Sequence, residues 1–168
     1  MIIAGIDYSL NGPAICVFNS DGKFCFNNCS FYYLTDKKSL AKTFLSRIHG
    51  KMFETYNHDC ERYDTISEWA VEMCYGCEQV AIEGYAYAAK GRVFNIAENT
   101  GLLKYKFYQQ SMPVEVVNPS IVKKLATENA VWRCDRRATQ VSAIAFQTAP
   151  PRTYYHPLFK YRMKLMHP

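Results

Sequence analysis

The sequence lacks the features that would place it among membrane, secreted or repeat proteins. It has no run of about 18 consecutive apolar residues, and its apolar opening stops at Asp7, so we expect neither a membrane span nor a signal-peptide core. Its seven cysteines are odd in number and scattered, which indicates free thiols in a reducing compartment. No repeat or linker divides the 168 residues, so we predict one domain.

Acidic residues are absent from the end of the chain. After Asp135 there is no Asp or Glu, whereas six basic residues follow: Arg136, Arg137, Arg152, Lys160, Arg162 and Lys164. The net charge of +5 and the pI of about 8.8 favour a polyanionic partner, because cations that neutralise phosphates release counterions. The positive charge supports such a partner only if the chain also has a candidate binding or catalytic site.

The first half of the chain alternates apolar runs with turn residues. Ile2–Asp7 and Ala14–Asn19 predict a β-hairpin, and a turn over residues 19–23 leads to a third strand, Phe24–Leu34. From Ser39 onward apolar residues recur at helical spacing, which predicts a long helical region interrupted near residues 56–60 and continuing to Met73.

The second half alternates strands with helices. Gly76 ends the helical region, and the pattern then predicts a buried strand Gln79–Glu83, a helix Val93–Gln110, a strand Val114–Val117 and a helix start at Asn118-Pro119. The predicted fold is α/β, with a mixed sheet of three antiparallel strands and then two parallel strands, flanked by helices.

Two acidic residues stand at the ends of apolar strands. Asp7 closes the first strand and Glu83 closes the strand after the helical region. A carboxylate at a strand end is held rigidly at the sheet rim, where α/β proteins place their chemistry, and a divalent cation compensates its charge. Pairing with a lysine or capping of a turn is the alternative for either residue alone.

Four segments resemble the RuvC-like Holliday junction resolvases of the RNase H-like superfamily. They are, in order, Gly5–Gly12, Val80–Gly84, Arg92–Gly101 and Val116–Lys124. The resemblance covers about residues 1–127, which we interpret as an RNase H-like nuclease core. Residues 128–168 form a divergent, basic C-terminal segment.

The resemblance implies a crossover junction endodeoxyribonuclease that binds Mg²⁺, or Mn²⁺, and hydrolyses a phosphodiester with two metal ions. Asp7 would bridge the metals and Glu83 would bind one of them. The family has two further acids, or an acid and a histidine, near a last helix. Here only Glu128 and Asp135 follow the segment, and His156 precedes a proline. Either the site is incomplete, or Asp135 or His156 completes it.

Basic and aromatic residues near these segments are candidate DNA contacts. Lys123 and Lys124, with Asn118 and Ser120 at a helix start, would clamp a phosphate. Lys90 and Arg92 follow Tyr85 and Tyr87 in a loop after Glu83, where the rings would stack on unpaired bases. A solvated helix face and ordinary packing of the tyrosines are the alternatives.

The resemblance also implies branched DNA as partner, a homodimer, and a cytoplasmic location in a cell or in the host of a phage or virus. Gly101, inside a predicted helix, fits close approach of a second backbone. One alternative function is a non-catalytic module that binds branched DNA. Another is a fragment of an actin-like or sugar-kinase ATPase, which would need a second lobe. A zinc site of Cys25, Cys29, Cys74 and Cys77 is a further alternative.

Overall fold

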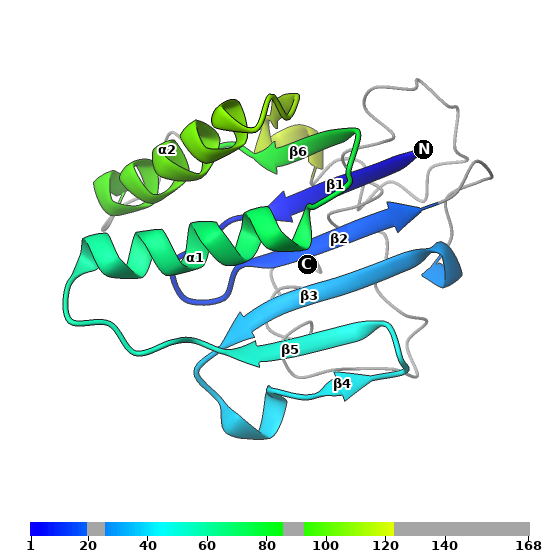
Figure 1. Ribbon diagram of the computed structural model, residues 1–168, viewed down its shortest axis with the longest axis horizontal. Helices are drawn as coiled ribbons and strands as arrows, with labels where there is room; N and C mark the ends of the chain where they lie inside the picture. The colour runs from blue at the N-terminus through cyan, green and yellow to red at the C-terminus, as the bar shows by residue number, and fades with distance from the viewer. Residues whose placement is uncertain (20–25, 86–92, 123–168) are drawn as a thin grey trace.

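The computed structural model describes residues 1–19, 26–85 and 93–122 (Figure 1). In this part of the chain one mixed sheet carries two complete α-helices on one face. The elements in chain order are β1 Ile2–Asp7, β2 Ala14–Asn19, the 3-10 turn η1 Phe26–Asn28, β3 Cys29–Thr35, the 3-10 turn η2 Lys38–Leu40, β4 Thr43–Phe44, β5 Ile48–Met52, α1 Asp59–Met73, β6 Gln79–Glu83, α2 Val93–Gln109 and β7 Val114–Val117.

The sheet has the order β4-β5-β3-β2-β1-β6-β7. Strands β1, β2 and β3 form the predicted antiparallel meander, and β6 and β7 add to β1 in parallel. The fold class predicted from the sequence is therefore confirmed. The first hairpin turns over residues 8–13, so that Asp7 pairs with Ala14.

The prediction of a helix over residues 39–52 is wrong. This stretch forms η2, β4 and β5, and β5 pairs in parallel with β3. Leu45 and Ser46 adopt positive φ angles at the tight turn between β4 and β5, which brings Phe44 opposite Ile48. The apolar spacing fits a helix. However, pairing with β3 over five residue pairs provides hydrogen-bond partners for the backbone and buries Ile48. These long-range contacts outweigh the local helical pattern.

Helix α1 begins and ends as the sequence indicates. His58 has an extended backbone and its Nδ1 accepts a hydrogen bond from the N–H of Glu61 at 3.2 Å, which caps the first turn. At the other end the chain reverses at Gly76, whose φ of 79° favours glycine. The reversal leads directly into β6.

The two faces of the sheet are covered differently. On one face α1 and α2 bury a large core that includes Ile6, Ile82 and Leu103. On the other face lie two separate, smaller clusters. One consists of β1, β2, β3 and β5 residues, including Ile3 and Phe31, and the other of Ala81, Val117 and Val122 near β6 and β7. No helix among the described residues is long and apolar enough to span a membrane.

Candidate metal and DNA site

Asp7 and Glu83 lie side by side at the ends of adjacent strands. β1 and β6 run in parallel with Ile6 opposite Ile82, so the next residue of each strand is a carboxylate at the same level. Neighbouring strands in a sheet are about 4.8 Å apart. The structure therefore brings together the two acids that the sequence singles out.

Both carboxylates lie on the same face of the sheet. Ile6 and Ile82 point into the core beneath α1 and α2, and successive side chains on a strand alternate between faces. Asp7 and Glu83 consequently lie on the opposite face, and each is only partly buried. Two carboxylates with solvent access on one face are a donor set that suits Mg²⁺ or Mn²⁺. Their role as metal ligands stays a prediction.

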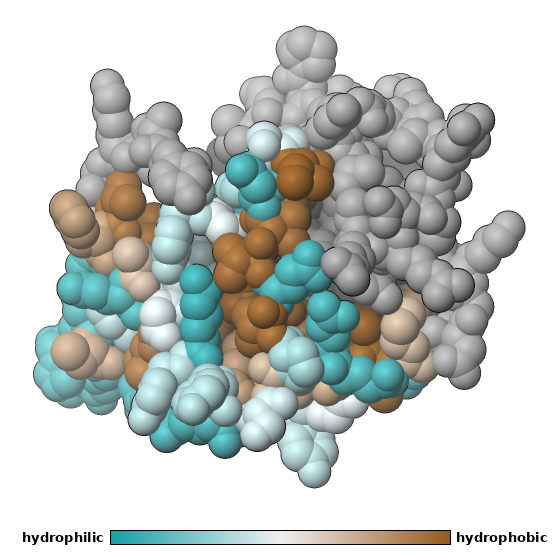
Figure 2. Space-filling view, turned by 90° about the horizontal axis from the view of Figure 1, so that it is seen from above, coloured by the Kyte–Doolittle hydropathy of each residue, from teal (hydrophilic) through white to brown (hydrophobic). Residues whose placement is uncertain are grey.

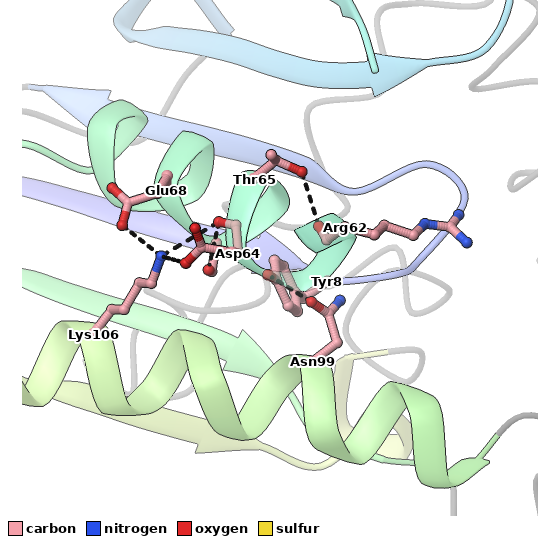
Figure 3. A network of polar contacts seen from close by, with 8 residues as sticks. Tyr8, Arg62, Asp64, Thr65, Glu68, Asn99 and Lys106 are labelled. Carbon is pink, nitrogen blue, oxygen red and sulfur yellow. Dashed lines mark hydrogen bonds and ion pairs between the residues drawn. The ribbon is translucent and has the colours of Figure 1, made fainter. Parts of the chain in front are cut away.

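The loop after Asp7 is fixed by contacts with both helices, of which Figure 3 shows the one made by Tyr8. The hydroxyl of Tyr8 donates to Asn99 Oδ1 of α2 at 3.1 Å. Nη2 of Arg62, on α1, donates to the carbonyl of Leu10 and to Asn11 Oδ1, both at 2.7 Å. Burial raises the pKa of Tyr8 well above its usual range, so the hydroxyl remains a donor.

Sequence reasoning missed Arg62 and Asn99. Arg62 is 8% exposed and Asn99 is 1% exposed, and both residue types are rarely buried without a partner. The available signal was a polar residue at a helical position that faces the core, four residues before Leu103 in the case of Asn99. Their hydrogen-bond partners lie 52 and 91 residues away in sequence, so no local pattern identifies which groups they contact.

The segment after Glu83 packs closely on β7 and α2. The N–H of Gly84 donates to the carbonyl of Val117 at 2.7 Å, and a Cβ at Gly84 would lie 3.2 Å from that oxygen. The hydroxyl of Tyr85 donates to the carbonyl of Ala97 at 3.4 Å, and Lys104 lies over its ring at 5.3 Å. The ring is thus held against α2. Stacking of Tyr85 on a base stays a prediction, and Tyr87, Lys90 and Arg92 lie outside the described residues.

The start of the helix after β7 lies at the same rim, because β7 is parallel to β6. Asn118 Oδ1 accepts hydrogen bonds from the N–H and the hydroxyl of Ser120 at 2.9 and 2.7 Å, so Asn118 caps this helix. Val122, one turn later, packs with Ala81 and Val117 on the face that carries Asp7 and Glu83. Asn118 as a DNA contact stays a prediction, and Lys123 and Lys124 lie beyond the described residues.

The described residues contain two metal-ligand candidates rather than a complete set. Within residues 1–19, 26–85 and 93–122 no group of three or more His, Cys, Asp or Glu side chains is placed to hold a metal ion. Asp135 and His156, the candidates for completing the site, and the proposed domain boundary at residue 127 lie outside this part of the chain. Of the candidate metal ligands, only Asp7 and Glu83 lie in the described part of the chain.

The cysteines do not support the alternative of a four-thiolate zinc site. Cys74 and Cys77 lie in the core beneath α1 and α2, whereas Cys29 lies in the cluster on the other face of the sheet. Cys74 and Cys77 hydrogen-bond to each other, which lowers the pKa of Cys77, and Cys16 is hydrogen-bonded to Cys29. The sheet separates the two pairs. Cys25 lies outside the described residues.

Comparison with solved structures supports the fold assignment. A structure of Thermus thermophilus RuvC matches 98% of this chain and 97% of its own, with a TM-score of 0.53 and 20% identity. T. thermophilus RuvC in complex with a Holliday junction substrate matches over 80% of this chain and 73% of its own, with a TM-score of 0.52 and 18% identity. Sequence comparison finds no matching family model and no matching curated protein. The chain resembles the RuvC-like resolvases, and its fold is theirs, the mixed RNase H-like sheet with helices on its face.

Proposed function

We propose that this protein is a metal-dependent endonuclease that cuts four-way or otherwise branched DNA, acting in the cytoplasm of a cell or of a virus-infected host. One observation carries the proposal: Asp7 and Glu83 end adjacent parallel strands at the same level and on the same partly exposed face. The fold likeness to RuvC, one structure of which holds a Holliday junction, supports it.

Asp7 and Glu83 would hold Mg²⁺ or Mn²⁺, with Asp135 as the proposed further ligand. A metal bound there would supply Lewis-acid chemistry, which activates a water and stabilises negative charge at a phosphate. Other residues of this chain hold the backbone around these two carboxylates in place. Tyr8 and Arg62 fix the loop after Asp7, and the contact of Gly84 with Val117 fixes the backbone beside Glu83.

A second candidate function is a module that binds branched DNA without cutting it. The observation that favours it is the absence of any acidic residue after Asp135, together with only two well-placed carboxylates among the described residues. Two carboxylates bind Mg²⁺ weakly, and phosphoryl chemistry needs metals held in fixed positions.

Cleavage of a labelled four-way junction in Mg²⁺ or Mn²⁺ distinguishes these functions. We expect the wild type to cut, and Asp7→Asn and Glu83→Gln to lower the rate at least about a hundredfold, which corresponds to roughly 2.7 kcal/mol of transition-state stabilisation. The matched control is Glu72→Gln, an exposed carboxylate on α1, which should cut like the wild type.

Three results would change the conclusion. Tight junction binding by the wild type without cleavage supports the non-catalytic module. Cleavage that survives both substitutions excludes the proposed ligands. A wild type that binds linear duplex as well as a junction removes both functions.

A further inference from the structure

A basic cluster lies where the third strand of the sheet ends. From Lys37 to Phe53 the chain has five Lys or Arg residues and no Asp or Glu. Lys37, Lys38 and Lys42 are exposed, and we call these three the basic rim. Lys51 is also exposed, but Glu54 offsets its charge at 3.2 Å. Arg47 precedes β5 and so lies at the opposite end of the strands.

The basic rim lies at the same edge of the sheet as Asp7 and Glu83. β3 follows two antiparallel steps from β1 and therefore runs parallel to it, and β5 runs parallel to β3. The carboxyl ends of β1, β3, β5 and β6 thus meet at one rim, on the left of Figure 1. The exposed Asp36 is the first residue after β3, and Lys37 and Lys38 follow it. The carbonyl of Lys42 accepts the N–H of Gly50 in β5 at 3.1 Å.

The backbone that carries the basic rim is held firmly. The buried hydroxyl of Tyr33 donates to the carbonyl of Leu40 at 2.6 Å, and the N–H of Lys37 donates to Thr35 Oγ1 at 3.1 Å. Gly50 lets this segment approach, because a Cβ there would lie 2.4 Å from the Leu40 oxygen. A rigid segment loses little backbone entropy when its side chains bind a ligand.

The spacing matches the path of a DNA duplex. β3 is the second strand from β1, so it lies about 10 Å from Asp7 at roughly 4.8 Å per strand. One base pair of duplex spans about 3.4 Å, so a phosphate about three to five base pairs from one held at Asp7 comes within reach of Lys37 and Lys38. Lys42 precedes β4 and lies farther out, on the other side of β5. Each phosphate contact there would release a counterion.

We propose that the basic rim binds the phosphate backbone of one duplex arm of the branched substrate. The identity of the ligand rests on the proposed function, since Asp7 and Glu83 define where the DNA is cut. The contact itself is additional to the candidates Lys90, Arg92, Asn118, Lys123 and Lys124. It positions an arm on the β3–β5 side of the sheet, away from β7.

The salt dependence of junction binding tests this contact. Binding of a labelled four-way junction is followed by fluorescence anisotropy between about 50 and 200 mM salt, in the Asp7→Asn background so that cutting is strongly slowed. We expect Lys37→Gln/Lys38→Gln/Lys42→Gln to reduce the slope of log Kd against log salt by up to about 2.7, and Lys38→Gln alone by up to about 0.9. Arg47→Gln, at the other end of the strands, is the control with one charge removed and should leave the slope unchanged.

The outcomes separate the basic rim from the proposed function. A triple variant with an unchanged slope and unchanged affinity overturns the contact and leaves the cutting proposal standing. Equal effects of Lys38→Gln and Arg47→Gln also overturn it, because they indicate a general charge effect. If the wild type fails to prefer a junction but the triple variant still lowers the slope on linear duplex, the contact with DNA stands and the proposed function fails. Thermal unfolding verifies that each variant is folded.

Discussion

Because Gly84 has no Cβ, the backbone next to Glu83 can pack closely against β7. A Cβ there would lie 3.2 Å from both Val116 Cγ1 and the carbonyl oxygen of Val117. That oxygen also accepts the Gly84 N–H at 2.7 Å, so the strands cannot separate without loss of this hydrogen bond. The side chain of Glu83 is attached to the adjacent Cα and would move with the backbone.

We therefore expect Gly84→Ala to destabilise the fold by about 1–3 kcal/mol, the range for overpacking a tight contact. We also expect it to lower junction cleavage more than junction binding. Urea unfolding and single-turnover cleavage measure the two effects. Gly12→Ala is the matched control, because nothing lies within 4 Å of a Cβ at Gly12. Equal behaviour of the two variants would show that Gly84 does not position Glu83.

At the scale of secondary-structure elements, two of the polar contacts that connect α1 to the rest of the molecule differ in burial. Arg62 is buried and supplies two hydrogen bonds to the loop after β1. Lys106 of α2 bridges Asp64 and Glu68 of α1, but both carboxylates are mostly exposed (Figure 3). Exposed ion pairs contribute little, because water and salt screen them, whereas hydrogen bonds of a buried charged group contribute more.

This difference predicts unequal effects of two substitutions that replace a charged side chain by the unbranched, apolar side chain of methionine. Arg62→Met should reduce the free energy of unfolding by about 2–4 kcal/mol, because it leaves the Leu10 carbonyl and the Asn11 amide without their donor. Lys106→Met should reduce it by about 1 kcal/mol or less. Urea unfolding of both variants at low and high salt measures the effect. A larger loss for Lys106→Met than for Arg62→Met would contradict the ranking.

The same scale explains what the sequence could and could not predict. The strands β1, β2, β6 and β7 and the helices α1 and α2 have local apolar periodicity, and their boundaries follow from residues such as Gly76 and Asn118. The β4–β5 hairpin depends on pairing with β3 and on positive φ angles at Leu45 and Ser46, which no local pattern encodes. The pair Asp7 and Glu83 was predictable because each acid ends its own apolar strand. Arg62 was not, because its partners are distant in the chain.

At the scale of the whole molecule, the outer surface of α2 has the features of an interface. Three aromatic side chains of α2 are 83, 57 and 78% exposed, namely Phe94, Tyr105 and Tyr108. Together with the exposed Glu98 and Gly101 they are spaced alternately four and three residues apart. This spacing lets two helices pack along a seam. Val116 of β7 and Ile121 are also exposed. Figure 2, which looks down on the side of the molecule where α2 and β6 lie, shows apolar residues gathered in the middle of this face.

Gly101 tests whether a second copy of the chain covers this seam. Among the described residues nothing lies within 4 Å of a Cβ at Gly101, so none of them requires a glycine at this position. In a monomer Gly101→Ala should therefore stabilise α2 by about 1 kcal/mol, because alanine is the better helix former, and Gly101→Leu should be tolerated. In a dimer that packs backbone to backbone at Gly101, Gly101→Leu should instead separate the subunits.

We expect the wild type to be a dimer by light scattering at micromolar concentration and Gly101→Leu to be a folded monomer. A dimer symmetrically presents two sites, so this variant should also lose paired cleavage of opposite junction strands while it retains single nicks. A monomeric wild type that both substitutions stabilise would exclude α2 as the interface.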